Sequence, residues 1–183
     1  MMRVQLPWDE ELDERGATFS ECKGYRYTLW RRWARDPMDV WLMLNPSTAD
    51  AVQNDPTVER CERRSRTMGA GGIIVLNVFA WRSTDPRGLR RVADPEGPLN
   101  RAVIRDVCLG ASQHGAIARV ICAWGGHGKD RGMELALFLH KSGVPLAALK
   151  LSKDGTPCHP LYLPYELQPR LWVPGLHLAA QIV

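Results

Sequence analysis

Four short, mostly apolar runs limit what this chain can fold into more than any other feature of its sequence. Their apolar residues follow one another instead of alternating with polar ones, which is typical of strands buried on both faces. Such strands belong to parallel sheets that helices cover on either side. We therefore expect a parallel sheet of four strands, at Val40–Leu44, Ile73–Phe79, Val120–Trp124 and Leu146–Leu151.

Segments with helical signals separate these runs. Asp55 and Pro56 supply a cap residue and a first-turn proline, and the stretch TVERCERRSRTMG follows them and ends in glycine. Pro98–Ser112 gathers apolar residues on one face, and the partly apolar Asp130–Lys141 ends just before Gly143. The alternation predicts a βαβ series with right-handed crossovers. The expected fold class is α/β, a three-layer α/β/α sandwich around a central four-stranded parallel sheet.

The length of 183 residues suits one domain with a sizeable core and is short for two. We expect a single domain over residues 1–183, with its core at about 25–164 and an extension at each end. Before the first run, YRYTLWRRW predicts a lead-in strand or helix. After the last one, LPYELQPRLWVPGLH is interrupted by prolines and has no clear assignment.

Composition narrows the cellular setting. The longest apolar run, Gly71–Trp81, is far shorter than a membrane span and contains Asn77, and the polar start MMRVQLPWDEELDERG does not resemble a signal peptide. The five cysteines form no C-x-x-C pair, which favours reduced thiols over disulfides or a metal site. A net charge of +4 is compatible with nucleic acid. We expect a cytoplasmic protein without a membrane partner, cofactor or metal.

Polar residues follow the carboxyl ends of the predicted strands, where open α/β sheets bind ligands. Asn45 ends the first run, Asn77 lies inside the second, and His159 comes after the fourth. An unpaired buried side-chain amide costs roughly 1–3 kcal/mol. The two asparagines therefore either satisfy each other or face a ligand.

Each candidate also has a purely structural interpretation. Asn45 could be a turn residue that bonds its own backbone, Asp55 could be a helix cap, and Asp50 could be an ordinary loop carboxylate. His159 could ligate a metal, but no partners stand at metal-ligand spacing.

Two basic features also have alternatives. The stretch GGHGK weakly resembles a phosphate-binding loop but lacks its spacing and the hydroxyl after the lysine. Arg60, Arg63, Arg64 and Arg66 spread around one helix, which indicates either a solvated face or phosphate contacts.

Several motifs together resemble those of a bacterial family known only as a domain of unknown function. They are LNPSTADA, DPTVERC, NVFAWRSTDP, AWGGHG and KDGTPCHPLYLP, and the match spans roughly residues 25–164. That family resembles, more distantly, the uracil-DNA glycosylase superfamily. This second resemblance implies a three-layer α/β fold with four parallel strands.

The resemblance also implies roles for single residues. Asn45 with Pro46 matches the first motif of the superfamily, whose acid or amide handles the water nucleophile. Asn77 matches the strand asparagine that hydrogen-bonds a flipped base. His159 matches the histidine that stabilises charge on the departing base, and Trp124 with Gly125 matches the step that closes the third strand.

Departures from the superfamily pattern bear on the substrate. Leu44 replaces the glycine before the first motif, and Ser47 replaces the bulky aromatic residue that bars pyrimidine 5-substituents in strict uracil enzymes. A small residue there implies a roomier pocket. Some members of the unknown-function family resemble phage-defence glycosylases that excise glucosylated hydroxymethylcytosine, and an open site is consistent with such a base.

The resulting expectation is a monofunctional DNA glycosylase of anti-phage defence, monomeric, that flips and excises a modified pyrimidine from double-stranded phage DNA. Alternatives are a uracil or damaged-base repair glycosylase, a nucleotide-acting enzyme, or a non-catalytic module that binds modified bases. The expected residues are Asn45, His159 and, if a base is needed, Asp50 or Asp55 for catalysis; Asn77, Ser47, Phe79 and Trp81 for the base; and Pro160, Leu161, Tyr162, Lys153, Arg82 and His127 for DNA.

Overall fold

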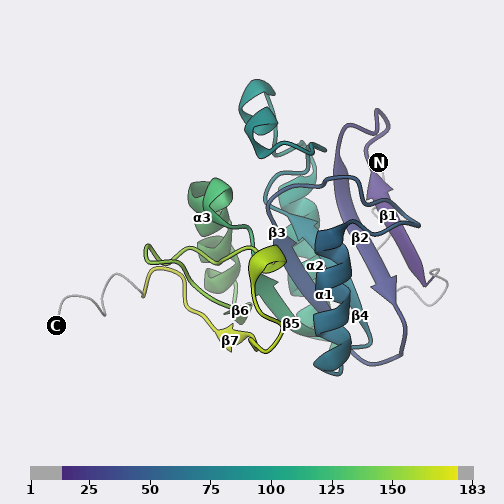
Figure 1. Ribbon diagram of the computed structural model, residues 1–183, viewed down its shortest axis with the longest axis vertical. Helices are drawn as coiled ribbons and strands as arrows, with labels where there is room; N and C mark the ends of the chain where they lie inside the picture. Colours follow the sequence, from purple (N-terminus) through teal and green to yellow (C-terminus); the bar gives the residue numbers. More distant parts are fainter. Residues whose placement is uncertain (1–13, 177–183) are drawn as a thin grey trace.

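A mixed sheet of seven strands forms the centre of the protein (Figure 1). The computed structural model describes residues 14–176, and its strand order is β1-β2-β4-β3-β5-β6-β7. The strands are β1 Arg15–Phe19, β2 Arg26–Arg32, β3 Met38–Met43, β4 Gly72–Asn77, β5 Ile117–Cys122, β6 Leu146–Ala148 and β7 Arg170–Leu171.

The four strands expected from the sequence, β4, β3, β5 and β6, are neighbours and run parallel to one another. The expected number of strands was wrong, because β1 and β2 add to one side of this group and β7 to the other, with antiparallel pairing at each step. The lead-in segment is thus a strand, β2. The two residues of β7 lie in the proline-interrupted segment, where so short a strand leaves no pattern to detect.

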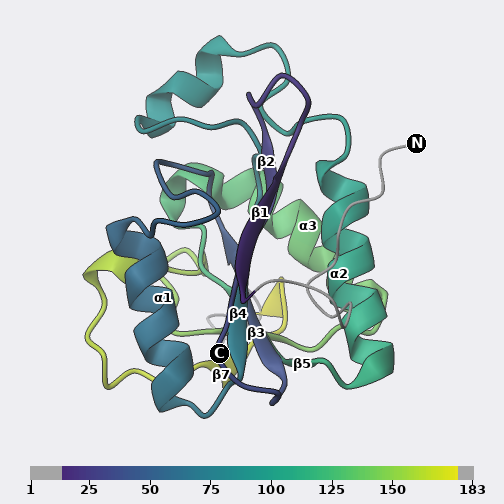
Figure 2. The same ribbon diagram turned by 90° about the vertical axis from the view of Figure 1, so that its right-hand side faces the viewer.

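Three α-helices lie close to their predicted positions: α1 Pro56–Thr67, α2 Asn100–His114 and α3 Lys129–Lys141. Figure 2 shows α1 on one side of the sheet and α2 and α3 on the other. Three short 3₁₀ turns complete the described elements, η1 Pro86–Arg91, η2 Gly126–Gly128 and η3 Pro160–Tyr162.

Strand alternation divides the core into two clusters, one on each face of the sheet. Trp41 and Val75 pack with Val58 of α1, whereas Leu42 and Ile74 pack in the cluster that contains the buried residues of α2 and α3. Both faces of β3 and β4 are therefore buried, which explains why their sequences are continuously apolar.

The helices and the cysteines bear on the expectations drawn from composition. Within residues 14–176, no helix is long and apolar enough to cross a membrane. All five cysteines are free: Cys61, Cys108 and Cys122 are buried, Cys158 is half-buried and Cys22 is exposed. Burial raises the pKa of the Cys108 thiol to about 12.

Candidate functional site

Asn77 is the last residue of β4, and it is buried with neither polar side-chain atom paired. It lies opposite Met43 of β3 and is 1% exposed. Among the described residues, neither its Nδ2 nor its Oδ1 has a hydrogen-bond partner. Alternation along β4 places its side chain on the face of Ile73 and Val75, which α1 covers. Asn77 therefore presents a donor and an acceptor at the carboxyl edge of the sheet.

A second buried asparagine close by is bonded through its amide nitrogen. Asn100 Nδ2 donates to the carbonyl oxygens of Asn77 at 2.9 Å and Val78 at 3.1 Å. The backbone at the end of β4 is thus held in place, while the side chain of Asn77 takes no part in holding it.

The side chain of Asn45 forms hydrogen bonds with loop carbonyl oxygens and not with Asn77. Its Nδ2 donates to the carbonyl oxygens of Ser83 at 2.7 Å and Pro46 at 3.0 Å. The bond to Pro46 agrees with a turn residue, and the bond to Ser83 joins the loops after β3 and β4. Its Oδ1 accepts no hydrogen bond from the part of the chain that the structure describes. The two asparagines do not satisfy each other.

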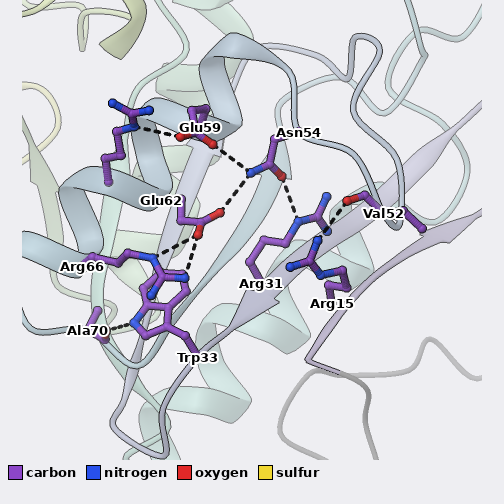
Figure 3. Close-up of polar contacts among 10 residues, drawn as sticks. Arg15, Arg31, Trp33, Val52, Asn54, Glu59, Glu62, Arg66 and Ala70 are labelled. Carbon is purple, nitrogen blue, oxygen red and sulfur yellow. Dashed lines mark hydrogen bonds and ion pairs between the residues drawn. The ribbon is translucent and has the colours of Figure 1, made fainter.

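The loop after Asn45 is held by arginines of β2. Arg31 donates to the carbonyl oxygens of Asp50 at 2.7 Å and Gln53 at 3.2 Å, and to Oδ1 of Asn54 at 2.9 Å. Figure 3 shows how Asn54 continues this chain of contacts to Glu62 on α1. These contacts from neighbouring elements fix the loop between β3 and α1.

Arg26 is a buried cation beneath the same loop. It is 2% exposed, and within residues 14–176 its side chain forms one hydrogen bond, from Nη1 to the carbonyl oxygen of Ala49 at 2.7 Å. Burial lowers the pKa of Arg26 to about 10, and the charge of Asp55 opposes that shift, so the guanidinium stays charged at neutral pH. Sequence reasoning missed it. Its position between two tyrosines in the expected lead-in segment was the available signal.

Both candidate carboxylates already accept backbone hydrogen bonds. Asp55 Oδ1 accepts from the backbone nitrogens of Thr57 and Val58, each at 2.9 Å, and caps α1. Asp50 Oδ1 accepts from Val52 at 2.8 Å and Gln53 at 2.7 Å. These bonds lower the pKa of Asp50, which makes it a weaker base.

His159 is half-buried and oriented by its own turn. Its Nδ1 accepts a hydrogen bond from the backbone N–H of Leu161 at 3.3 Å. Burial lowers the pKa of His159, and the charge of Asp55 partly opposes this. A neutral imidazole whose Nδ1 is an acceptor carries its proton on Nε2. His159 therefore offers an uncharged N–H donor.

The end of β5 approaches His159 closely. Gly125 has a φ of 72° and donates from its backbone nitrogen to the carbonyl oxygen of Pro157 at 3.0 Å. A Cβ at Gly125 would lie 3.2 Å from the Cβ of His159. Positive φ and this close approach both favour glycine here. The segments after β5 and β6 therefore lie side by side.

Two arginines of α1 fasten the segment that carries His159. Arg60 donates to the carbonyl oxygens of Pro160 at 3.2 Å and Leu163 at 2.6 Å, and Arg64 donates to those of Leu163 and Pro164, both at 2.8 Å. A solvated face was therefore the wrong interpretation for Arg64, which is 2% exposed. It holds for the exposed Arg63 and Arg66, which pair with glutamates.

The predicted DNA-contacting residues are only partly brought together. His159 is followed by the buried Pro160, the half-buried Leu161 and then Tyr162, which is 87% exposed. His127 and Lys153 are exposed, and the ion pair of Lys129 with Asp154 at 2.8 Å joins the segments that carry them. Arg82 lies apart, where its Nη1 donates to the carbonyl oxygen of Lys23 at 3.3 Å.

The predicted base-contacting residues also do not all lie together. Phe79 and Trp81 pack against the cluster beneath α2 and α3, on the opposite face of the sheet from Asn77. Trp81 also makes an edge contact with Tyr25. Ser47 is half-buried in the loop after Asn45. The structure therefore does not bring the two aromatic residues together with Asn77.

Comparisons with known proteins give one result. A family model described as "Protein of unknown function (DUF1643)" matches residues 26–161. No curated protein and no solved structure matches the chain. Among the described residues, no group of three or more histidine, cysteine, aspartate or glutamate side chains is placed to hold a metal ion.

Proposed function

The chain belongs to the DUF1643 family of proteins of unknown function, and we propose that it is a monofunctional DNA glycosylase. It would flip a modified pyrimidine out of duplex DNA and hydrolyse the bond between the base and the sugar, leaving an abasic site. The preferred substrate is a 5-substituted cytosine such as glucosylated hydroxymethylcytosine in phage DNA, and the setting is cytoplasmic anti-phage defence.

The unpaired side chain of Asn77 carries this proposal. A buried amide without partners costs roughly 1–3 kcal/mol, so a fold that keeps one at a sheet edge gains from it elsewhere. An amide offers one donor group and one acceptor, which match the hydrogen-bonding edge of a pyrimidine. Asn77 is 1% exposed, so the segments around it must open to admit a base.

His159 supplies the second role, stabilisation of the departing base. When the glycosidic bond breaks, its electron pair stays with the base, which becomes an anion, and the sugar becomes cationic. A preorganised donor aimed at such a developing charge is worth several kcal/mol. The Nε2–H of a neutral His159 is such a donor, and the Leu161 backbone keeps its proton on that nitrogen.

Asn45 supplies the third role, positioning of the water that attacks the sugar. Its amide nitrogen is held by Ser83 and Pro46, which fixes the side chain and leaves Oδ1 to accept from a water molecule. An amide is a poor base, but a water that attacks a sugar already cationic needs little deprotonation in the transition state. The proton passes to solvent once the new C–O bond has formed.

Two further observations support the likeness to uracil-DNA glycosylases. The four parallel strands at the centre of the sheet have their polar residues at the carboxyl edge, where such folds bind ligands. Ser47, in place of a bulky aromatic residue, stands two residues after Asn45 and leaves space beside a pyrimidine 5-substituent.

The test is base release from duplexes that contain glucosylated hydroxymethylcytosine, uracil or unmodified cytosine, followed by alkaline cleavage of abasic sites. The expected result is cleavage of the glucosylated duplex. Asn45→Ala and His159→Ala should each lower the single-turnover rate about a hundred-fold or more, the scale of removing one such group. His140→Ala, an exposed histidine of α3, is the matched control and should keep the full rate.

Absence of strand breaks on every duplex would overturn the enzymatic proposal. Tight binding to the glucosylated duplex without base release would instead assign the protein to the modified-base-binding modules. Cleavage of the uracil duplex alone would keep the reaction and replace the substrate.

A further inference from the structure

A cleft of about 480 Å³ lies beside the last turns of α1, between this helix and the segment 165–168. Its lining includes Arg63, Arg64, Arg66, Tyr165, Leu167 and Gln168. Asp55 caps the opposite end of the same helix. The cleft is therefore separate from Asn45, Asn77 and His159.

The described residues that line the cleft include three arginines. No carboxylate is among the residues that line the cleft. Glu59 and Glu62 pair with Arg63 and Arg66, each at 2.8 Å, and offset part of their charge. Within the described residues neither pair uses the Nη1 group of its arginine. Arg64 has no such partner within the described part of the chain. The Glu166 carboxylate acts on its charge without an ion pair among the described residues, so the charge of Arg64 also favours an anionic ligand.

Arg64 is buried, and only backbone carbonyl oxygens accept from it. Its Nη1 donates to Tyr165 at 3.2 Å and Leu167 at 3.3 Å, in addition to the two Nη2 bonds described above. Its Nε has no acceptor, and the residue is 2% exposed. Carbonyl dipoles satisfy donors but do not cancel the net charge, so a buried cation here favours an anion nearby.

Aromatic rings hold two of these guanidinium groups in place. The Arg64 guanidinium carbon lies 5.0 Å from the centre of the Tyr165 ring, and that of Arg66 lies 4.0 Å from the centre of the Trp33 ring. Figure 3 shows Arg66 beside Trp33 and bonded to Glu62. Arginine forks that are already oriented lose little entropy on binding, and they match the oxygens of a phosphate.

We propose that this cleft binds the phosphate group of a nucleotide through the exposed guanidinium groups of Arg63 and Arg66, and that the buried charge of Arg64 adds to the attraction. A volume of about 480 Å³ can hold a mononucleotide, and Tyr165, 42% exposed, offers a ring for a base to contact. The same chemistry can come from a free nucleotide or from the backbone of bound DNA. The inference does not depend on base release, because phosphate binding needs no catalysis.

Calorimetric titration of the full chain with three probes tests this site: inorganic phosphate, deoxycytidine monophosphate and a short unmodified duplex. Gln168→Glu places a carboxylate in the lining, and Arg63→Gln removes one of its positive charges. Both positions are exposed, so both variants should fold. Ala102→Glu adds the same charge on an exposed position of α2, across the sheet, and serves as the control.

The expected result is saturable binding that both cleft variants weaken about ten-fold or more, as an added nearby charge should, while Ala102→Glu leaves it unchanged. If the cleft variants weaken the binding of deoxycytidine monophosphate, the ligand is a free nucleotide. If they weaken only the binding of the duplex, the ligand is the DNA backbone. Binding of all three probes that is absent or unaffected by the cleft variants overturns the site. Base release by the wild-type protein is measured separately, so failure of one proposal leaves the other standing.

Discussion

The two ends of helix α1 meet different kinds of polar group. Near its first turn stand the neutral amide of Asn77 and the half-buried imidazole of His159, and the Asp55 carboxylate is engaged in capping the helix. Near its last turn, Arg64 carries a buried charge that forms no ion pair with a carboxylate of residues 14–176. Unpaired neutral groups suit a neutral partner such as the edge of a base, whereas an unpaired cation suits a phosphate.

The two ends also differ in how much their polar side chains contribute to the stability of the fold. Arg64 donates to four carbonyl oxygens, whereas the side chain of Asn77 has no hydrogen-bond partner within residues 14–176. Removing a bonded group leaves its partners unsatisfied, while removing an unbonded one leaves nothing behind. Replacement by an apolar residue should therefore lower the free energy of unfolding at Arg64 but not at Asn77.

The largest effect is expected at Asn77. Asn77→Leu, which keeps the volume and removes the amide, should lower single-turnover base release about a hundred-fold or more because it removes the donor and the acceptor for the base. The free energy of unfolding should stay unchanged or rise, since the lost amide had no partners. Rapid-quench kinetics and urea unfolding measure the two quantities.

Asn100→Leu is the matched control for this variant. Its Nδ2 bonds to the carbonyl oxygens of Asn77 and Val78 would be lost, so we expect a stability loss of about 2 kcal/mol. Equal destabilisation by both substitutions would contradict the distinction between a structural and an unpaired asparagine.

At the other end of α1, Arg64→Met should destabilise the protein by about 2–3 kcal/mol, because four carbonyl oxygens lose their donors. Arg63→Met removes only an exposed ion pair with Glu59, which is worth about 1 kcal/mol at most. Thermal and urea unfolding of the two variants give the comparison. A similar loss for both would mean that the carbonyl bonds of Arg64 add little.

Asp55 could stabilise α1 as its cap, act as the general base in catalysis, or do both. Asp55→Asn keeps a good cap and removes the charge, whereas Asp55→Ala removes the cap and should cost about 1 kcal/mol. We expect Asp55→Asn to unfold like the wild type and to keep base release within about ten-fold. A far larger loss of rate in Asp55→Asn would assign the general base to this residue instead of leaving water positioning to Asn45.

The sequence predicted the parallel centre of the sheet because buried parallel strands are apolar on both faces, and Trp41 and Leu42 do pack on opposite sides. It predicted the cap at Asp55 because proline follows directly. Arg64 and Arg26 escaped detection because their partners are backbone carbonyls of distant segments, and a carbonyl leaves no trace in residue identity. Phe79 and Trp81 follow the end of β4 at Asn77, where strand alternation no longer assigns a side chain to a face.

The smallest expected effect concerns the titration of His159. Burial lowers the pKa of its imidazole, and the Asp55 carboxylate raises it, so Asp55→Asn should lower that pKa further. The unfolded chain binds a proton at the ordinary value near 6.5, so the stability linked to His159 should fall as the pH drops from about 6.5 through the lower folded value. Proton NMR of the imidazole ring across this range measures the pKa, and urea unfolding at each pH measures the stability. A pKa that stays unchanged or rises in Asp55→Asn would mean that the Asp55 carboxylate does not act on His159 in the folded protein.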